Sequence, residues 1–124
     1  MSALNIPVIN THVGITPKYR GLHGGYWALV EKNIKCFGTT VHLVDSGIDT
    51  GCIIAQKAIQ ISRRDNFSTY PLLQVIEGLE CLDVAIKQAE EKKITITENT
   101  LDSNLFFHPT ITKYLFHRLI NHVK

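Results

Sequence analysis

The stretch GTTVHLVDSGIDTGCIIAQKAI, residues 38–59, decides the fold because it holds two strand-like runs joined by a short polar loop. Residues 39–44 are rich in β-branched side chains, which pack well on a pleated surface. Residues 52–61 form the second apolar run. The loop of residues 45–51 is shorter than the dozen or so residues that a parallel crossover needs. We therefore predict an antiparallel pair of strands.

Toward the N-terminus, residues 6–9 form a short apolar run that ends at Asn10. Such a run, bounded by a polar loop, is typical of a buried strand. Residues 11–25 follow, rich in glycine and proline, and loops longer than about 12 residues in compact domains are usually functional. Residues 26–32 predict a short helix. This part of the chain therefore reads as a strand, a functional loop and a helix.

Toward the C-terminus, residues 68–91 predict a long amphipathic helix because apolar side chains recur at i, i+3, i+4 and i+7. Pro71 is tolerated only in the first turn, so the helix should begin near Ser68 or Thr69. The residues expected on its buried face are Leu72, Val75, Ile76, Leu79, Leu82, Ala85, Ile86 and Ala89.

Residues 94–97 alternate like a short edge strand, and a final helix should begin at Pro109 or Thr110. The sequence shows neither an internal repeat nor a linker. We predict one α/β domain over residues 1–124, a small twisted sheet with helices packed on it.

The composition excludes several classes of protein. The 124 residues are 44% hydrophobic and 19% charged, which is typical of a folded protein and not of a disordered one. The net charge of +2 and the scattered basic residues argue against a nucleic-acid partner. No stretch approaches the roughly 20 apolar residues that cross a bilayer, and the N-terminus does not resemble a signal peptide. We therefore expect no membrane association and a cytoplasmic location.

The three cysteines, Cys36, Cys52 and Cys81, are widely spaced and match no zinc or redox motif. Each lies among apolar residues, so we expect each to be a small, reduced core side chain. The sequence predicts no metal site.

Three polar residues could form a reactive site. Asn10 and His12 are two residues apart, so an extended backbone sends both side chains to one side. Asp49 lies in the loop after the second predicted strand, between Gly47 and Gly51. An amide, an imidazole and a carboxylate together can support acyl transfer. Alternatively, Asn10 and Asp49 form turns and His12 is a hydrogen-bonded loop residue. From the residues alone both interpretations stay open.

Other candidates have structural interpretations as well. Arg20 is a loop cation that contacts either a phosphate or only solvent. Tyr26 and Trp27 are expected to pack in the core, since aromatic side chains dominate core burial. His42 is expected to be a structural histidine that supports the reactive loop.

Several blocks of the sequence resemble, in order and spacing, the signature of the folate-dependent formyltransferases. The resemblance covers residues 6–56. The family includes glycinamide ribonucleotide, methionyl-tRNA and sugar-nucleotide formyltransferases. The matching blocks are Asn10-Thr11-His12, residues 17–21, Trp27-Ala28, residues 38–42, Asp49-Thr50-Gly51 and Gln56.

The resemblance implies a direct transfer of the formyl group of 10-formyltetrahydrofolate to a primary amine. Asn10, His12 and Asp49 stand at the catalytic positions. Asn10 and His12 would stabilise the oxyanion, and Asp49 would assist proton movement and orient His12.

The resemblance also implies ligand-binding residues. The folate loop would consist of Val44, Asp45, Ser46, Gly47 and Ile48, and the substrate would meet Arg20, Gly21 and His23. The block of residues 21–27 is nearer to the glycinamide ribonucleotide type, so the expected acceptor is a small nucleotide-type amine. A sugar nucleotide is the alternative.

Two departures qualify the expected enzyme. Residues 13–16 differ from the Pro-Ser or Gly-Ser that usually follows the catalytic histidine. In addition, a Rossmann-like half usually precedes the Asn-x-His strand, within a mostly parallel sheet. We therefore expect a partial Rossmann-like domain, the C-terminal half with the N-terminal half absent. The exposed sheet edge would then be covered in a homodimer or by another partner. A folded, non-catalytic remnant is the alternative function.

Overall fold

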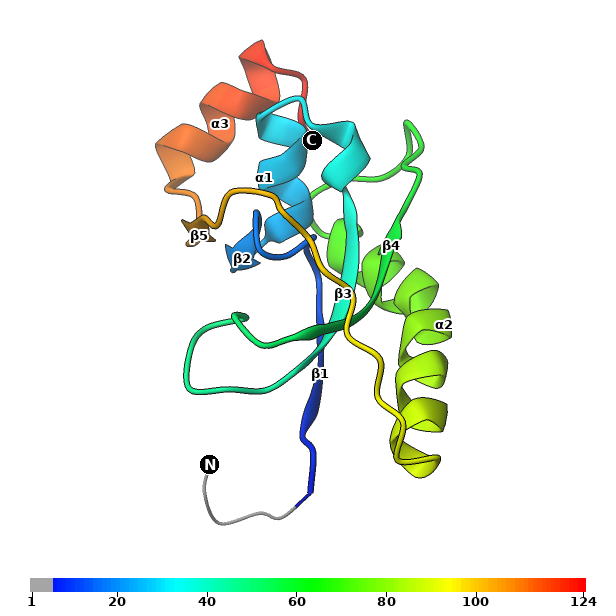
Figure 1. Cartoon of the computed structure of the whole chain (residues 1–124). Helices are drawn as coiled ribbons and strands as arrows, with labels where there is room; N and C mark the ends of the chain where they lie inside the picture. The colour runs from blue at the N-terminus through cyan, green and yellow to red at the C-terminus, as the bar shows by residue number, and fades with distance from the viewer. Residues whose placement is uncertain (1–5) are drawn as a thin grey trace.

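The computed structural model describes residues 6–124 and has the predicted α/β fold (Figure 1). Its main sheet has three strands in the order β1-β3-β4, with β1 at Ile9–His12, β3 at Gly38–Leu43 and β4 at Ile53–Ala58. Both pairings are antiparallel, which confirms the prediction for β3 and β4. The first strand lies later than the expected residues 6–9, because its pairing with β3 continues through polar residues.

A second sheet pairs β2 (Arg20–Gly21) with β5 (Leu105–Phe106) in parallel. Parallel and antiparallel strand pairs therefore both occur. The mostly parallel sheet that the family resemblance implied is not formed by residues 6–124, whose three-stranded sheet is wholly antiparallel.

Within the described residues 6–124 there are also three α-helices and one short 3-10 helix: α1 at Gly24–Val30, η1 at Ile34–Cys36, α2 at Tyr70–Glu90 and α3 at Ile111–Ile120. Pro71 lies in the first turn of α2, as predicted. The side chain of Thr110 caps α3 by accepting from the Lys113 backbone N–H at 3.3 Å. Within residues 6–124 no helix has both the length and the apolar character needed to cross a membrane.

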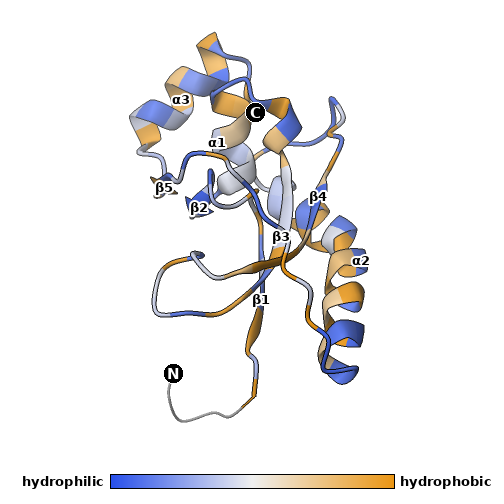
Figure 2. Cartoon of the chain, in the orientation of Figure 1, coloured by the Kyte–Doolittle hydropathy of each residue, from blue (hydrophilic) through white to orange (hydrophobic). Residues whose placement is uncertain are grey.

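The buried face of α2 is not the predicted one. Leu72, Ile76 and Leu79 are each more than half exposed, and Figure 2 shows apolar residues recurring along the helix. The sheet-facing residues are Tyr70, Gln74, Gly78, Cys81 and Ala85, so Ala85 alone of the expected eight is buried.

Polar contacts explain this orientation of α2. The Thr39 hydroxyl donates to the Gln74 carbonyl at 2.7 Å, and the Gln74 amide donates to the Gly38 carbonyl at 2.5 Å. Gly78, one turn after Gln74, allows this close approach, because a Cβ at this position would meet the Thr39 side chain. Contacts with the strand, and not the number of apolar residues, therefore choose the face.

A hydrophobic core lies where α1 and the C-terminus meet the start of α2. Its buried members are Tyr26, Leu29, Phe37, Ile59, Tyr70 and Val123. Cys36 and Cys81 are buried as predicted. The prediction for Cys52 is wrong: its side chain is exposed because it lies in the loop that leads into β4.

Residues 94–107, here called the strap, run from the end of α2 back across the sheet to β5 (Figure 1). Thr97 donates to the Ile53 carbonyl at 2.7 Å, and Asn104 donates to the Pro17 carbonyl at 3.2 Å. Residues 94–97 do not form the predicted edge strand; they contribute a single bridge from Thr97 to Ile53. The strap thus links segments that are far apart in the sequence.

Candidate active site

Asn10 and His12 project from the face of the sheet that α2 does not cover. In the β1–β3 register Asn10 is opposite His42, and His12 is opposite Thr40. Thr39, one residue before Thr40, points its hydroxyl to α2. Because successive strand residues alternate between faces, Thr40 and its partner His12 lie on the other face. The strand thus sets two candidate residues side by side, as the sequence predicted.

Asp49 joins them from the loop between β3 and β4. One carboxylate oxygen, Oδ2, lies 3.3 Å from His12 Nδ1 and accepts from the Gly21 backbone N–H at 2.9 Å. The other, Oδ1, accepts from Asn10 Nδ2 at 3.5 Å. Asp49 itself has a left-handed backbone, with φ of 50°, a conformation that aspartate tolerates better than most residues. The structure therefore brings the three predicted catalytic residues together.

His12 is held from both sides of its ring. Its side chain is buried, and Nε2 lies 2.7 Å from the Tyr19 carbonyl oxygen, to which it donates. Burial lowers the pKa of His12, the hydrogen bond to Tyr19 and the charge of Asp49 oppose this shift, and His42 adds to it. The net direction is down, which favours the neutral ring. Because Nε2–H donates to Tyr19, the neutral ring has its lone pair on Nδ1 beside Asp49.

The chain leaves room for the His12 ring by placing a glycine beside it. A Cβ on Gly14 would lie 2.5 Å from the Tyr19 oxygen and 2.7 Å from His12 Nε2. Both distances are shorter than atoms can approach without a shift of the backbone, so a side chain at this position would displace the ring.

His42 is a fourth member of the cluster. Its Nδ1 donates to the Leu43 carbonyl at 2.8 Å, which leaves Nε2 as an acceptor for Asn10 Nδ2 at 3.2 Å. The same Nε2 lies 3.4 Å from Asp49 Oδ1. His42 is buried, and it positions the Asn10 amide. The strand register identifies His42 as a member of the cluster, because it places this residue directly opposite Asn10.

The predicted folate loop, Val44–Ile48, is organised by Asp45. The Asp45 carboxylate accepts from the Gly47 N–H at 2.9 Å and from the Thr50 hydroxyl at 2.7 Å. These contacts, the Thr50 hydroxyl first, lower the pKa of Asp45. Ser46, Gly47 and Ile48 are exposed, so the loop is available to a ligand.

The three predicted substrate residues are not all at one place. Arg20 donates to the Ile48 carbonyl at 3.0 Å, and Gly21 holds Asp49, so both lie next to the site. His23 instead contacts His108, with 2.7 Å between Nε2 and Nδ1, and its ring packs against Phe67. His23 therefore belongs to a different part of the surface.

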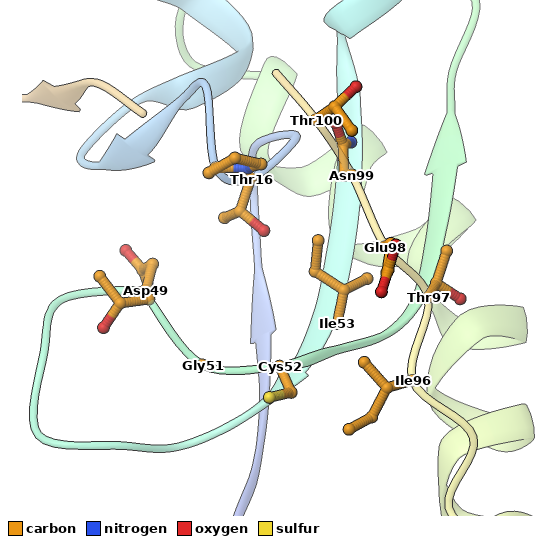
Figure 3. Close-up of a pocket in the computed structure, with 12 residues that line it drawn as sticks. Thr16, Asp49, Gly51, Cys52, Ile53, Ile96, Thr97, Glu98, Asn99 and Thr100 are labelled. Carbon is orange, nitrogen blue, oxygen red and sulfur yellow. The ribbon is translucent and has the colours of Figure 1, made fainter. Parts of the chain in front are cut away.

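Two cavities meet at Asp49. One, of about 320 Å³, lies between the loop that carries Asp49 and the strap (Figure 3). The other, of about 280 Å³, lies on the β2–β5 side and is mainly apolar; its lining is Gly21, Leu22, Ile48, Asp49, Leu105, Phe106 and Phe107. No group of three His, Cys, Asp or Glu side chains in residues 6–124 is arranged to hold a metal ion. Asp49 thus lies between two cavities.

Sequence reasoning missed the strap and Tyr19. The backbone oxygen of Tyr19 orients His12, and a backbone atom gives no signal in side-chain patterns. The strap reaches the site only through long-range hydrogen bonds, which no local periodicity reveals.

Comparisons with known proteins show which family this chain resembles. The family model described as Formyl transferase matches residues 1–72. A methionyl-tRNA formyltransferase of Caldanaerobacter subterraneus is 34% identical over 109 residues, covering 88% of this chain and 35% of that protein. A phosphoribosylglycinamide formyltransferase of Bacillus subtilis is 44% identical over 62 residues, covering 50% of this chain and 31% of that protein.

A solved structure is similar as well. The N-formyltransferase of Helicobacter canadensis, in complex with folinic acid and dTDP-3-aminofucose, superposes with a TM-score of 0.69 at 25% identity, covering 80% of this chain and 37% of that one. This chain thus spans about a third of the length of the relatives named here. The family model covers more than half of the 124 residues, and on this evidence the chain belongs to the formyltransferase family.

Proposed function

We propose that this chain supplies the catalytic groups for transfer of a formyl group from 10-formyltetrahydrofolate to a primary amine. The observation that carries the proposal is the convergence of Asn10, His12 and Asp49 on the face of the three-stranded sheet that α2 does not cover. The donor supplies an activated formyl carbon. The side chains of this protein do the rest: they bind, orient and move protons.

Asn10 is the donor for the negative charge that develops on the formyl oxygen. One N–H of its amide is used on His42 at 3.2 Å, and the contact of the other with Asp49, at 3.5 Å, is at the outer limit of a hydrogen bond. That second N–H is therefore available to an oxyanion. A preorganised donor of this kind stabilises the transition state more than the ground state.

His12 and Asp49 take the proton that the attacking amine loses. The neutral His12 ring has its lone pair on Nδ1, 3.3 Å from Asp49 Oδ2. A proton taken there is shared with the carboxylate, and the imidazolium so formed places positive charge beside the oxyanion. As the bond between the formyl carbon and the folate nitrogen breaks, this proton goes to the leaving nitrogen.

The residues on the β2–β5 side fit the flat ring of a folate. Of the predicted loop Val44–Ile48, Ile48 lines the apolar cavity, together with Leu22 and Phe107. Apolar walls with a few polar groups are typical of sites for such ligands. The related Helicobacter enzyme was solved with folinic acid, which supports a folate donor for this chain.

The proposed acceptor is a small nucleotide-type amine that resembles glycinamide ribonucleotide. The similarity to a phosphoribosylglycinamide formyltransferase supports it. The second candidate is an amino sugar nucleotide, favoured by the dTDP-3-aminofucose in the Helicobacter structure. Arg20, beside Ile48, is the cation proposed to meet an acceptor phosphate.

A non-catalytic remnant is the competing proposal, because β1 pairs on one side only among the described residues. The test incubates the purified chain with 10-formyltetrahydrofolate and either amine, and follows the formylated product by mass spectrometry. The proposal predicts product with one amine and its loss in Asn10→Ala. Absence of product with both amines, from a chain shown to be folded, would favour the remnant.

A further inference from the structure

The cavity beside the strap has three walls from distant parts of the chain. The loop of residues 49–53 forms one wall, residues 96–100 of the strap form the opposite wall, and Thr16 and Pro17 close the top. Figure 3 shows Asp49 and Glu98 on opposite sides of this space. Its volume of about 320 Å³ is within the range of small-molecule sites.

The charged side chains that line this cavity are both acidic. They are Asp49 and Glu98, and the lining includes no lysine, arginine or histidine. Two carboxylates attract a cation and repel a phosphate.

An unpartnered hydroxyl also belongs to the lining. Thr16 is 2% exposed, and its Oγ1 forms no hydrogen bond within residues 6–124. Its backbone is fully used, since the N–H donates to the Thr40 hydroxyl at 3.1 Å and the carbonyl accepts from Gln56 at 2.6 Å. Figure 3 shows the hydroxyl directed toward the space between Asp49 and Ile53. A buried hydroxyl usually has a hydrogen-bond partner, and a polar ligand atom in this cavity would supply one.

The wall that carries Glu98 is anchored on both sides. Thr97 donates its backbone N–H to Ile53 at 2.7 Å, and Asn99 donates its amide to Gln56 at 2.9 Å. Gln56 in turn holds Thr16 and Thr40. The strap therefore keeps a fixed position relative to Thr16, and Glu98 remains exposed beside the cavity.

We propose that this cavity receives the amine-bearing end of the acceptor and that Glu98 determines specificity there for a cationic or hydroxyl-bearing, unphosphorylated group. This inference rests on the proposed formyl transfer. The two cavities share Asp49 as a wall, so an amine entering here meets a formyl donor held on the apolar side. Any acceptor phosphate must then lie outside this cavity.

The test is a binding titration that needs no folate. Glycinamide, a small primary amine without phosphate, is added at neutral pH to the ¹⁵N-labelled chain, and inorganic phosphate is added to a second sample. We expect glycinamide to shift the backbone amides of residues 16 and 97–100 saturably, and phosphate to leave them unchanged. Glu98→Gln should weaken glycinamide binding about three- to tenfold.

Asp102→Asn is the matched control, because Asp102 is an exposed acid on the same strap outside the cavity lining. Its binding constant should equal that of the unsubstituted chain. Thr16→Val, which removes the buried hydroxyl at nearly constant shape, should weaken binding as well. Equal effects of Glu98→Gln and Asp102→Asn, or shifts confined to residues 21–22 and 105–107, would overturn the proposal. Glycinamide binding without formyl transfer would instead count against the proposed function alone.

Discussion

Gly21 and Asp49 lie 28 residues apart in sequence and are joined by a hydrogen bond of 2.9 Å from the Gly21 N–H to Asp49 Oδ2. Gly21 belongs to β2, which is paired with β5 at the end of the strap. The position of the carboxylate thus depends on a backbone group that the C-terminal part of the chain holds in place. A substitution that keeps an oxygen at this point should preserve the loop while changing its charge.

The first prediction concerns Asn10 and Asp49 as catalytic groups. If the proposed function holds, Asn10→Ala should lower kcat by about 10²–10³, the usual loss for one oxyanion donor. Asp49→Asn keeps an acceptor for Gly21 and should also lower kcat. The melting temperature should change little in Asp49→Asn. Formyl-transfer assays and thermal melts on the same samples measure both effects.

The control for these variants is Asp102→Asn, on an exposed acid outside the linings of both cavities. It should leave both kcat and the melting temperature unchanged. The double substitution of Asn10 and Asp49 should cost less than the product of the single effects, because both groups act on one transition state. Unchanged kcat in a destabilised Asn10→Ala protein would retire the catalytic assignment.

The second prediction is a pH dependence of stability that comes from His12. Burial lowers the pKa of His12 below its ordinary value of 6.5, against the opposing effects of Tyr19 and Asp49. Below pH 6.5 the unfolded chain therefore binds more protons at this residue than the folded chain. The free energy of unfolding should be highest above pH 6.5 and fall as the pH decreases toward the folded pKa, by at most about 1.4 kcal/mol per pH unit.

Urea denaturation between pH 5 and 8 measures this slope. His12→Gln should reduce the slope but not abolish it, because burial also lowers the pKa of His23. His122→Gln, on an exposed histidine, should keep the slope of the unsubstituted chain. An identical slope in the His12→Gln variant would show that His12 is not the group that titrates.

The third prediction concerns Gln56, which joins the strap to the core. Its amide donates to the Thr16 carbonyl at 2.6 Å and to the Thr40 hydroxyl at 2.9 Å, while its oxygen accepts from Asn99. Gln56→Ala removes these partners together and should lower the free energy of unfolding by about 1–3 kcal/mol. Gln60→Ala, on an exposed glutamine, should change it by less than about 0.5 kcal/mol. Equal urea midpoints for the two variants would contradict this role.

Local patterns predicted the elements whose boundaries depend on neighbouring residues. The β-branched run before residue 44 predicted β3, and the position of Pro71 predicted the start of α2. Two of the site residues could also be predicted, because the alternation of side chains in a strand places Asn10 and His12 on one side.

Features that depend on tertiary contacts could not be predicted from the sequence. The buried face of α2 is set by the contacts of Gln74 with β3. The prediction from apolar periodicity alone therefore gave the wrong face. The strand β1 continues through Asn10 and His12 because β3 pairs with them, although polar residues by themselves suggest a loop. Glu98 reaches its cavity only because Thr97 and Asn99 bond to β4.

The last prediction is that α2 pairs with α2 of a second copy. Its exposed or half-buried outer face carries a heptad pattern, with Leu72, Leu79 and Ile86 at one core position and Val75, Leu82 and Ala89 at the other. Such a stripe is complementary to itself across a two-fold axis. The acidic residues beside this stripe, Glu77 and Glu80, already form ion pairs with Lys57 of the same chain, at 3.0 and 2.9 Å.

Sedimentation velocity of the full chain at high micromolar concentration should therefore show a dimer. Leu79→Glu places a charge in the middle of the stripe and should yield a monomer with an unchanged melting temperature, because Leu79 is more than half exposed in the single chain. Leu119→Glu on α3 is the matched control, since Leu119 is also a largely exposed leucine on a helix. It should leave the dimer intact. A monomer from the unsubstituted chain, or a dimer lost in Leu119→Glu but kept in Leu79→Glu, would show that α2 is not the interface.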